Sequence, residues 1–490
     1  MNSTIHLSNG IININPTTGQ LCHSVTITDG FVVQHDTPLP VGAMHIDLQG
    51  QYAVPGLIDS HIHLVLAATG MDEVDLRPCD SKESFQTALL QSKKTTPKGQ
   101  WLVGSGWSVQ SLGKEPNGQW IPDEIEFPVL CYRDDFHTAI FNDALLRYLD
   151  IKRLRTMPGG QSVDKGIVQE DALFDGLMPF IPTISVETQL GRIHRAIQAL
   201  HQQGITLVGS MEHKRDIDSL LIQIQKTQSI RMRLMCLDEP TDKMIEDCKT
   251  LKEDDFLRLT GFKSFLDGTL GSRSAKMYAD WLDEKGSGTW TGHASNGSLQ
   301  HWIKNVTQAG FSPVLHAIGD EAVGLALSLL QQVDPALTPR IEHAQCVAEK
   351  DISAVQGMCF GVQPLHQPGD SAIAMKALGN TRSNELHNWR RMIDAGGTLS
   401  FGSDWPVTPP RPLDAMAIAI SQGVTAREAL VASTINAAQS LQSKHAGHLR
   451  IGAFGDIAIL DQDPIQCNWR KTVPSVTMTI QAGKIVFKKE

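Results

Sequence analysis

Residues 54–64 read VPGLIDSHIHL, an apolar run that ends in two histidines one residue apart. Successive side chains of a β-strand point to opposite faces, so His61 and His63 project from the same face. Their imidazole nitrogens can then converge on one point, as metal ligands do. Chance explains a single His-x-His pair equally well, so the interpretation depends on the rest of the chain.

Seven further β-rich runs follow, and amphipathic helical stretches such as residues 187–203, 219–228 and 321–333 lie between or beside them. Strands that alternate with helices are typical of βα units around a parallel sheet. Eight such units predict an α/β fold, a TIM-type (β/α)8 barrel of about 250 residues. The eight runs fall near residues 53–63, 204–213, 231–237, 261–268, 312–320, 340–345, 359–364 and 398–404.

The first and second runs are too far apart for a single crossover. Residues from about 65 to 195 must include an inserted lobe, with strand-like segments at 101–107 and 128–141. The loop after the first strand of a barrel opens on the C-terminal face, where active sites lie. We therefore expect the lobe to cover a site.

Both ends of the chain carry short alternating strands broken by turn residues. Each end alone has too few strands for a stable sheet, so we expect the two ends to pair in one β-sandwich. The predicted domains are a composite β-sandwich of residues 1–54 and 445–490, and a barrel of residues 55–444 that includes the lobe at about 65–195.

Ligand-type side chains recur where other predicted strands end. His316 lies in VLHAIGD, His343 in RIEHAQ and Asp404 in FGSDWPV, and Lys263 lies at the same level of the fourth run. Side chains at the ends of several barrel strands meet at one mouth, which makes chance a poor explanation. Imidazoles with one carboxylate suit Zn²⁺, Mn²⁺, Fe²⁺ or Co²⁺, with Zn²⁺ the first choice. The pattern predicts an open, hydrolytic metal site.

The composition argues against several classes of partner. Lys and Arg number 43 against 53 Asp and Glu, for a net charge of −10, and no basic run interleaves with aromatic residues, so we expect no nucleic-acid partner. No apolar stretch approaches the roughly 20 residues that span a bilayer, and MNSTIHLSNG is unlike a secretory signal. We expect a cytoplasmic protein without a membrane partner, acting on a small molecule, with a homodimer as the default assembly.

Together, the motifs resemble those of the metal-dependent amidohydrolase superfamily, from VPGLIDSHIHL through FGSDWPV to AGHLRIGAFGDIAILDQDP. The set GITLV, GFKSFLDGTLGSRSA, HAIGD, RIEHAQ and GVQPLH is similar to amidohydrolase family 3, which includes N-substituted formamide deformylase-like proteins. The resemblance covers nearly the whole chain. It implies a barrel joined to a small β-sandwich built from both termini.

The resemblance also implies a role for each strand-end residue. His61 and His63 would bind the more buried ion, His316 and His343 the second, and Asp404 would be both ligand and proton acceptor. A cation-bound water of lowered pKa would attack a polarised carbonyl, and Asp404 would pass the proton to the leaving nitrogen.

Lys263 falls where several superfamily members carry a carboxylated lysine that bridges two metal ions. An ordinary ion pair, for example with Asp267, is the alternative. We favour two ions. With one ion, the expected ligands are His61, His63, His316 and Asp404.

Four further residues are candidates for substrate contacts. His137 in RDDFHTAIFN matches the acidic-x-His-then-Asn pattern of the family, although Phe136 stands where glycine is commoner. Each of the others also has an ordinary structural explanation: Trp107 in GSGW, Arg273 in GSRSA and His366 in QPLH.

The resulting prediction is a metal-dependent hydrolase that cleaves the carbon–nitrogen bond of a small, non-peptide amide. The alternatives are a mononuclear deaminase, an ester or lactone hydrolase of the same superfamily, and a non-catalytic scaffold. Deaminases typically place a glutamate soon after the strand-5 histidine, whereas His316 is followed by Ala-Ile-Gly-Asp. The scaffold is disfavoured because none of the implied ligands is missing.

Overall fold

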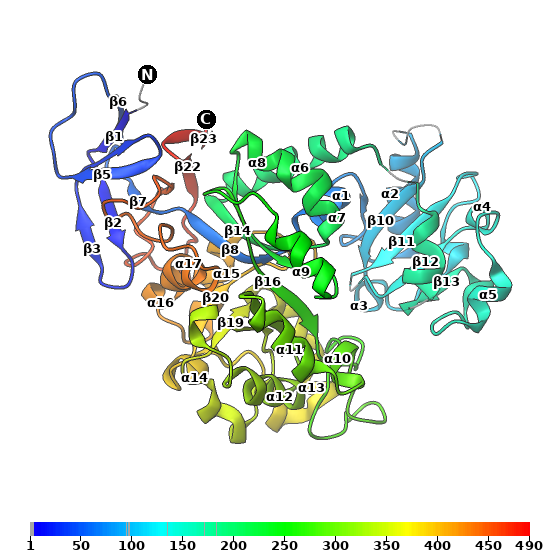
Figure 1. Cartoon of the computed structure of the whole chain (residues 1–490). Coiled ribbons are helices and arrows are strands. Elements are labelled where there is room, and N and C mark those ends of the chain that lie inside the picture. The colour runs from blue at the N-terminus through cyan, green and yellow to red at the C-terminus, as the bar shows by residue number, and fades with distance from the viewer. Residues whose placement is uncertain (1–3, 95, 97–98, 135, 171, 183) are drawn as a thin grey trace. The chain divides into compact units, whose positions relative to one another are not determined.

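A computed structural model of the chain describes residues 4–94, 96, 99–134, 136–170, 172–182 and 184–490 (Figure 1). The chain divides into two compact units. One comprises the residues up to Ala67 together with Ile193–Glu490, and the other comprises Ala68–Arg192.

The first unit is built on an eight-stranded parallel sheet in the order β20-β19-β18-β17-β16-β15-β14-β8. Two hydrogen bonds join the two edge strands of this sheet, because they link the end of β8 to the segment after β20. The Asp404 N–H donates to the His61 carbonyl (2.7 Å), and the His63 N–H donates to the Trp405 carbonyl (2.9 Å). The sheet is thus a nearly closed barrel, which confirms the predicted TIM-type fold. Its strands are β8 (Leu57–Ile62), β14 (Ile205–Glu212), β15 (Arg231–Cys236), β16 (Leu257–Phe265), β17 (Ser312–Ala317), β18 (Arg340–His343), β19 (Cys359–Val362) and β20 (Thr398–Phe401).

The barrel strands could be recognised because they are buried on both faces. Every residue of β8, β14, β15 and β17 is buried, as expected for parallel strands covered by helices. Helix α11 (Leu299–Gln308) shows the complementary pattern, burying Leu299, Trp302, Ile303 and Val306 along one stripe. Other helices of the barrel region are α8 (Ile222–Thr227), α9 (Asp242–Lys249), α12 (Asp320–Leu330), α14 (Trp389–Asp394), α15 (Pro412–Ser421), α16 (Ala426–Ala432) and α17 (Ile435–Ser440).

One further sheet of this unit combines strands from both ends of the chain, as predicted, and another is built from N-terminal strands alone (Figure 1). The shared strand pair is β7 with β21, which run antiparallel. Apolar side chains of both sheets form one core, including Ile5, Leu7, Ile457 and Ile480. One sheet has the order β5 (Phe31–His35), β4 (Val25–Thr28), β1 (Thr4–Ser8), β6 (Met44–Asp47), and the other β23 (Lys484–Lys488), β22 (Val476–Gln481), β21 (Ile457–Leu460), β7 (Tyr52–Pro55), β2 (Ile11–Asn15), β3 (Gln20–Cys22).

Deleting residues 445–490 should destabilise the whole chain. The deletion removes β21 from its pairing with β7 and exposes the edge of β7. It also removes Asp456, whose carboxylate lies 2.7 Å from the buried Arg231 guanidinium on β15. An unpaired buried charge costs about 3–5 kcal/mol. We expect a lower thermal unfolding midpoint and little soluble protein, whereas deleting only the edge strand β23 should have a smaller effect. Cooperative unfolding of the longer deletion at the midpoint of the full chain would contradict this prediction.

The second unit is the predicted inserted lobe between β8 and β14. Its sheet has the order β13-β12-β11-β10-β9. The segment 128–141 forms two antiparallel strands, β11 and β12, joined by a turn in which Phe136 has the left-handed φ of 59° that glycine favours. The elements include β9 (Val74–Asp75), α2 (Lys82–Lys93), β10 (Leu102–Trp107), β11 (Val129–Arg133), β12 (Thr138–Phe141), α5 (Ile151–Thr156) and β13 (Ile167–Gln169). Helix α6 (Val186–Gln202) leads back to the barrel.

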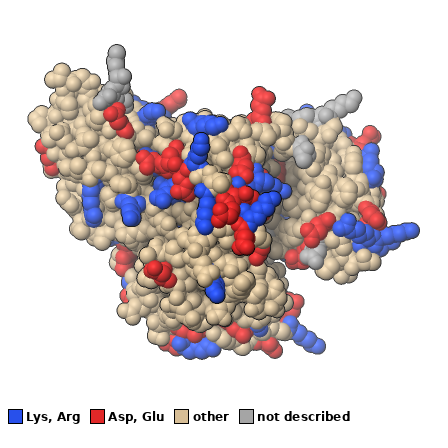
Figure 2. All heavy atoms as spheres, viewed as in Figure 1, with Lys and Arg blue, Asp and Glu red and all other residues tan. Residues whose placement is uncertain are grey.

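Within the described residues, no helix combines the length and the apolar character needed to cross a bilayer. Figure 2 shows one face of the molecule, where acidic and basic side chains are mixed rather than gathered into areas of one sign.

Candidate active site

The first barrel strand and the segment after the last one bring His61, His63 and Asp404 together. The Nε2 atoms of both histidines lie 3.3 Å from the same Oδ1 of Asp404. The side chain of His61 is 1% exposed and that of His63 19%. Closure of the barrel requires glycine at position 402, because a Cβ there would lie 2.6 Å from the Cβ of His61.

Two of the predicted ligands have left-handed backbone conformations. The φ angle is 56° at Asp404 and 71° at His343. Such conformations are uncommon for residues other than glycine, cost about 1–3 kcal/mol, and cluster at active sites. The surrounding structure therefore holds these two side chains in place at a cost in stability.

A group of imidazole rings surrounds His343. Its ring centroid lies 4.5 Å from that of His316, the penultimate residue of β17, and 5.0 Å from that of His61. His366, in the short helix η8 (Pro364–His366) after β19, has its ring centroid 6.4 Å away and nearly parallel. Four strand ends thus contribute rings to one place, in accordance with the topology of a barrel mouth.

In the described part of the chain, the potential ligand atoms form two groups that share Asp404. Within each group, all ligand atoms lie within 4.8 Å of one another. The groups are His61, His63 and Asp404, and His343, His366 and Asp404. His366, predicted as a substrate contact, thus lies with the metal-ligand candidates.

His316 belongs to neither group. Its Nε2 lies 3.2 Å from the Gly268 carbonyl, to which it can donate a hydrogen bond. In that tautomer the lone pair of His316 is on Nδ1. His366 differs, because its buried Nε2 has no hydrogen-bond partner in the described part of the chain.

The electrostatics keep most of these imidazoles neutral. Burial lowers the pKa of His63, His343 and His366, and burial together with Lys263 lowers that of His316 to about 3. Neutral imidazole is the form that binds metal ions. Burial opposes ionisation of Asp404, yet His61 and His63 outweigh it and hold the Asp404 pKa well below its usual range. Apart from His61, whose pKa is raised, the site therefore combines neutral nitrogen donors with one carboxylate.

Lys263 on β16 is 3% exposed, and its Nζ lies 5.2 Å from the centroid of the Phe265 ring. Among the described residues it has no ion-pair partner within 4.0 Å. Asp267, the suggested partner, instead accepts hydrogen bonds from backbone N–H groups, including those of Ile318 and Gly319. Burial, partly opposed by Glu342, lowers the Lys263 pKa to about 8.

Sequence reasoning missed Glu342 and Arg340 on β18. The Nδ1 of His61 lies 2.6 Å from the Glu342 Oε2, and Arg340 Nη2 lies 2.7 Å from the other carboxylate oxygen. Burial raises the Glu342 pKa, but Arg340 and His61 outweigh it and lower the pKa to about 2. The signal in the sequence was that RIEH places Arg340 and Glu342 within a predicted barrel strand. The structure buries all four residues of this strand.

The two candidate substrate residues of the lobe have partners inside the lobe. Trp107 has no exposed surface, and its Nε1 donates to the Cys131 carbonyl at 2.9 Å, so it packs in the lobe core rather than on a pocket wall. The His137 side chain is 40% exposed, with its Nδ1 3.0 Å from Glu170 Oε2.

Arg273 lies in the loop after β16. Its Nη2 is 2.8 Å from Asp283 Oδ2, and its guanidinium lies 5.6 Å from the Trp281 ring centroid. These contacts account for Arg273 as a residue that stabilises its own loop.

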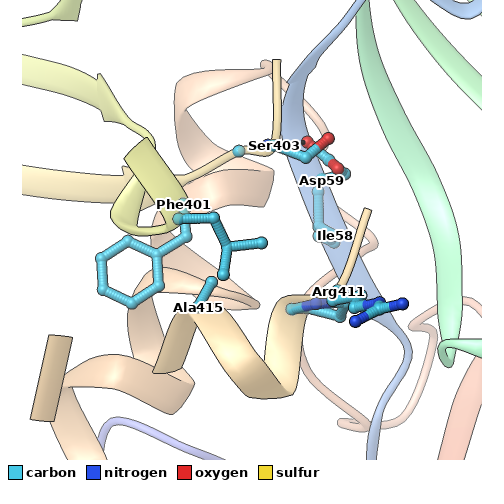
Figure 3. Close-up of a pocket in the computed structure, with 9 residues that line it drawn as sticks. Ile58, Asp59, Phe401, Ser403, Arg411 and Ala415 are labelled. Carbon is cyan, nitrogen blue, oxygen red and sulfur yellow. Dashed lines mark hydrogen bonds between the residues drawn. The ribbon is translucent and has the colours of Figure 1, made fainter. Parts of the chain in front are cut away.

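A small pocket lies between β8, β20 and the start of α15 (Figure 3). Asp59 forms part of its wall and accepts hydrogen bonds from the Ser403 N–H at 2.9 Å and the His61 N–H at 3.2 Å. The pocket contains none of the predicted ligand histidines. Asp59 thus ties the two segments that carry His61 and Asp404 to each other.

Comparison with known proteins adds three findings to this geometry. The sequence model of a family described as "Amidohydrolase family" matches residues 45–487. Protein LONG AFTER FAR-RED 3 of Arabidopsis thaliana is 28% identical over 91% of this chain and 84% of that protein, and N-substituted formamide deformylase of Arthrobacter pascens is 24% identical over 86% and 85%. The crystal structure of an uncharacterized metal-dependent hydrolase from Pyrococcus horikoshii OT3 has a TM-score of 0.80 and 25% identity, covering 96% of this chain and 99% of that one.

Proposed function

This chain belongs to the amidohydrolase family and is an enzyme that hydrolyses carbon–nitrogen bonds, and we propose that its substrate is a small, non-peptide amide cleaved with the aid of divalent cations at the barrel mouth. The observation that carries the proposal is the convergence of His61 and His63 on one oxygen of Asp404.

The residues present fit a cation because their lone pairs face one another. His61 can donate its Nδ1 proton to Glu342, and His63 its Nδ1 proton to the Met211 carbonyl, 3.2 Å away. In these tautomers both Nε2 atoms turn lone pairs towards the Asp404 carboxylate, which is itself an acceptor. Only a proton or a cation placed between these acceptor atoms relieves the repulsion between their lone pairs. Accordingly, although burial and Lys263 lower the His61 pKa, Asp404 and Glu342 raise it above its usual value.

We assign His61, His63 and Asp404 to one cation, and His316 and His343 to a second, with Zn²⁺ as the first choice for both. Bound there, a divalent cation provides a nucleophile from water at neutral pH and polarises the substrate carbonyl. His366, whose buried Nε2 has no hydrogen-bond partner among the described residues, offers a ligand atom within 4.8 Å of those of His343 and Asp404 and is a further ligand or a substrate contact.

Lys263 would supply an anionic ligand if two cations were bound and its amine were carboxylated. Its amine is buried and free of ion pairs among the described residues, and a pKa of about 8 leaves part of it neutral near pH 7. The neutral amine is the form that adds CO₂, and release of one N–H proton then leaves an anionic carbamate.

Asp404 moves the proton of the reaction. Its buried, ionised carboxylate accepts a proton from the attacking water and returns it to the leaving nitrogen, which departs as an amine. The low exposure of Asp404 and His61 keeps bulk water away from this transfer. The products are a carboxylic acid and an amine.

Removing the metal with a chelator should abolish hydrolysis, and adding Zn²⁺ or Mn²⁺ should restore it, because the proposed cation is what makes bound water a nucleophile at neutral pH. The assay measures amine release from a panel of N-formyl amines, N-acyl amines and cyclic amides, and elemental analysis follows the metal content. Full activity in metal-free protein would end the proposal. One bound ion per chain, together with a protein mass that shows no modification of Lys263, would contradict only the proposal of two cations.

A further inference from the structure

The two carboxylate oxygens of Glu342 contact two different side chains. Its Oε2 lies 2.6 Å from Nδ1 of His61, and its Oε1 lies 2.7 Å from Nη2 of Arg340. All three side chains are at most 1% exposed. This buried chain runs from an arginine to one of the histidines that face Asp404.

A glycine makes room for this arrangement. A Cβ at Gly361 on β19 would lie 2.0 Å from Glu342 Oε2 and 2.9 Å from Arg340 Nη2. The φ angle at Gly361 is not positive, so space rather than backbone conformation requires the glycine there. The neighbouring strand is therefore shaped around the carboxylate oxygen that contacts His61.

Pairing with Arg340 does not by itself explain Glu342. The strongest arginine–carboxylate pairs are bidentate, with two nitrogens on two oxygens. Among the described residues, the buried Nε and Nη1 atoms of Arg340 and the Oε1 of Glu342 have no hydrogen-bond partner. A buried ion pair of this kind contributes little net stability compared with apolar side chains. Arg340 and Glu342 do not form a bidentate pair, and Oε2 of Glu342 accepts from His61 instead.

We propose that Glu342 is a positioning residue that holds His61 in the tautomer with its proton on Nδ1, so that Nε2 presents its lone pair to a divalent cation shared with Asp404. This inference rests on the proposed metal-dependent function. A carboxylate that accepts the second N–H of a ligating histidine fixes the ring orientation and raises its basicity as a ligand. Arg340 Nη2 lies 2.7 Å from Oε1 of Glu342, and the absence of a side chain at Gly361 leaves the space for Oε2.

The test is the Zn²⁺ affinity of the full chain after metal removal, measured by competition with a chromophoric chelator. Loss of such a partner typically weakens metal binding by about 10- to 100-fold. We expect Glu342→Gln, which keeps an acceptor oxygen, to raise the Kd near the lower end of this range, and Glu342→Met near the upper end. The visible absorption of the Co²⁺-loaded variants should change in the same order.

A second variant separates positioning from folding. Glu342→Met alone leaves Arg340 as an unpaired buried charge, whereas Arg340→Met/Glu342→Met removes both charges and should recover thermal stability. The double variant should still bind Zn²⁺ as weakly as Glu342→Met. Asp456→Asn is the matched control, because it breaks another buried arginine–carboxylate pair, with Arg231, without touching a histidine ligand.

The outcomes distinguish the two proposals. A raised Kd in both Glu342 variants and in the double variant, with an unchanged Kd in Asp456→Asn, supports the positioning role. Binding of Zn²⁺ by the double variant with the Kd of the unmodified chain overturns it. Failure of the unmodified chain to bind Zn²⁺ overturns the proposed function, and this inference with it.

Discussion

Replacing Asp404 by asparagine should lower turnover by about 10²- to 10⁴-fold while bound metal is largely retained. The amide keeps an oxygen in the place of Oδ1, which lies 3.3 Å from the Nε2 atoms of His61 and His63. It cannot accept a proton, and general acid–base catalysis typically contributes a factor of this size. The measurements are kcat on the best amide of the panel and metal content by elemental analysis.

Asp414→Asn on α15 is the matched control. The Asp414 carboxylate is partly exposed, makes a long ion-pair contact of 3.9 Å with Arg411, and belongs to neither ligand group. It should leave kcat unchanged. If Asp404→Asn retained near-normal turnover on every substrate that the unmodified enzyme accepts, Asp404 would not be the proton acceptor.

Replacing His61 by alanine should reduce both metal content and activity to background. The substitution removes one of the few donors at the site and leaves the buried Glu342 without its histidine partner. An unpaired buried carboxylate also destabilises the fold, so thermal unfolding should accompany the metal analysis.

His45→Ala is the control for this change, since His45 lies exposed on β6 in the β-sandwich, where it bonds to Ser8. It should retain full metal content. A His61→Ala protein that is folded, fully metal-loaded and active would contradict the assignment of His61 as a ligand. Together, the Asp404 and His61 variants separate the loss of a base from the loss of a ligand.

The fold could be predicted because its signals are local. Strands such as β14 and β15 are buried at every position, so each appears as a continuous apolar run. Strands of the two ends, such as β4 with the sequence VTIT, alternate apolar and polar residues along the chain. The barrel and the β-sandwich were thus predicted from patterns that span fewer than about ten residues each, and the inserted lobe from the distance between the first two runs.

The candidate site could be predicted only in part. His61, His63, His316, His343 and Asp404 stand at strand ends, and a barrel brings all such ends to one mouth whatever lies between them. Their roles as ligands stay predictions. Trp107 shows the opposite case, because its motif GSGW is equally compatible with a pocket wall and with the lobe core in which it lies.

The sequence by itself determined the class of fold, the strand that begins the barrel and the type of donor at each strand end, since periodicity and residue chemistry are properties of short segments. Only the tertiary structure decided which atoms meet. The contact of His61 with Glu342 joins residues 281 positions apart, and the space for it depends on the absence of a side chain at Gly361. Likewise, the unpartnered Nε2 of His366 is a property of its burial. Such contacts follow from how strands pack around the barrel axis, and no local pattern along the chain encodes them.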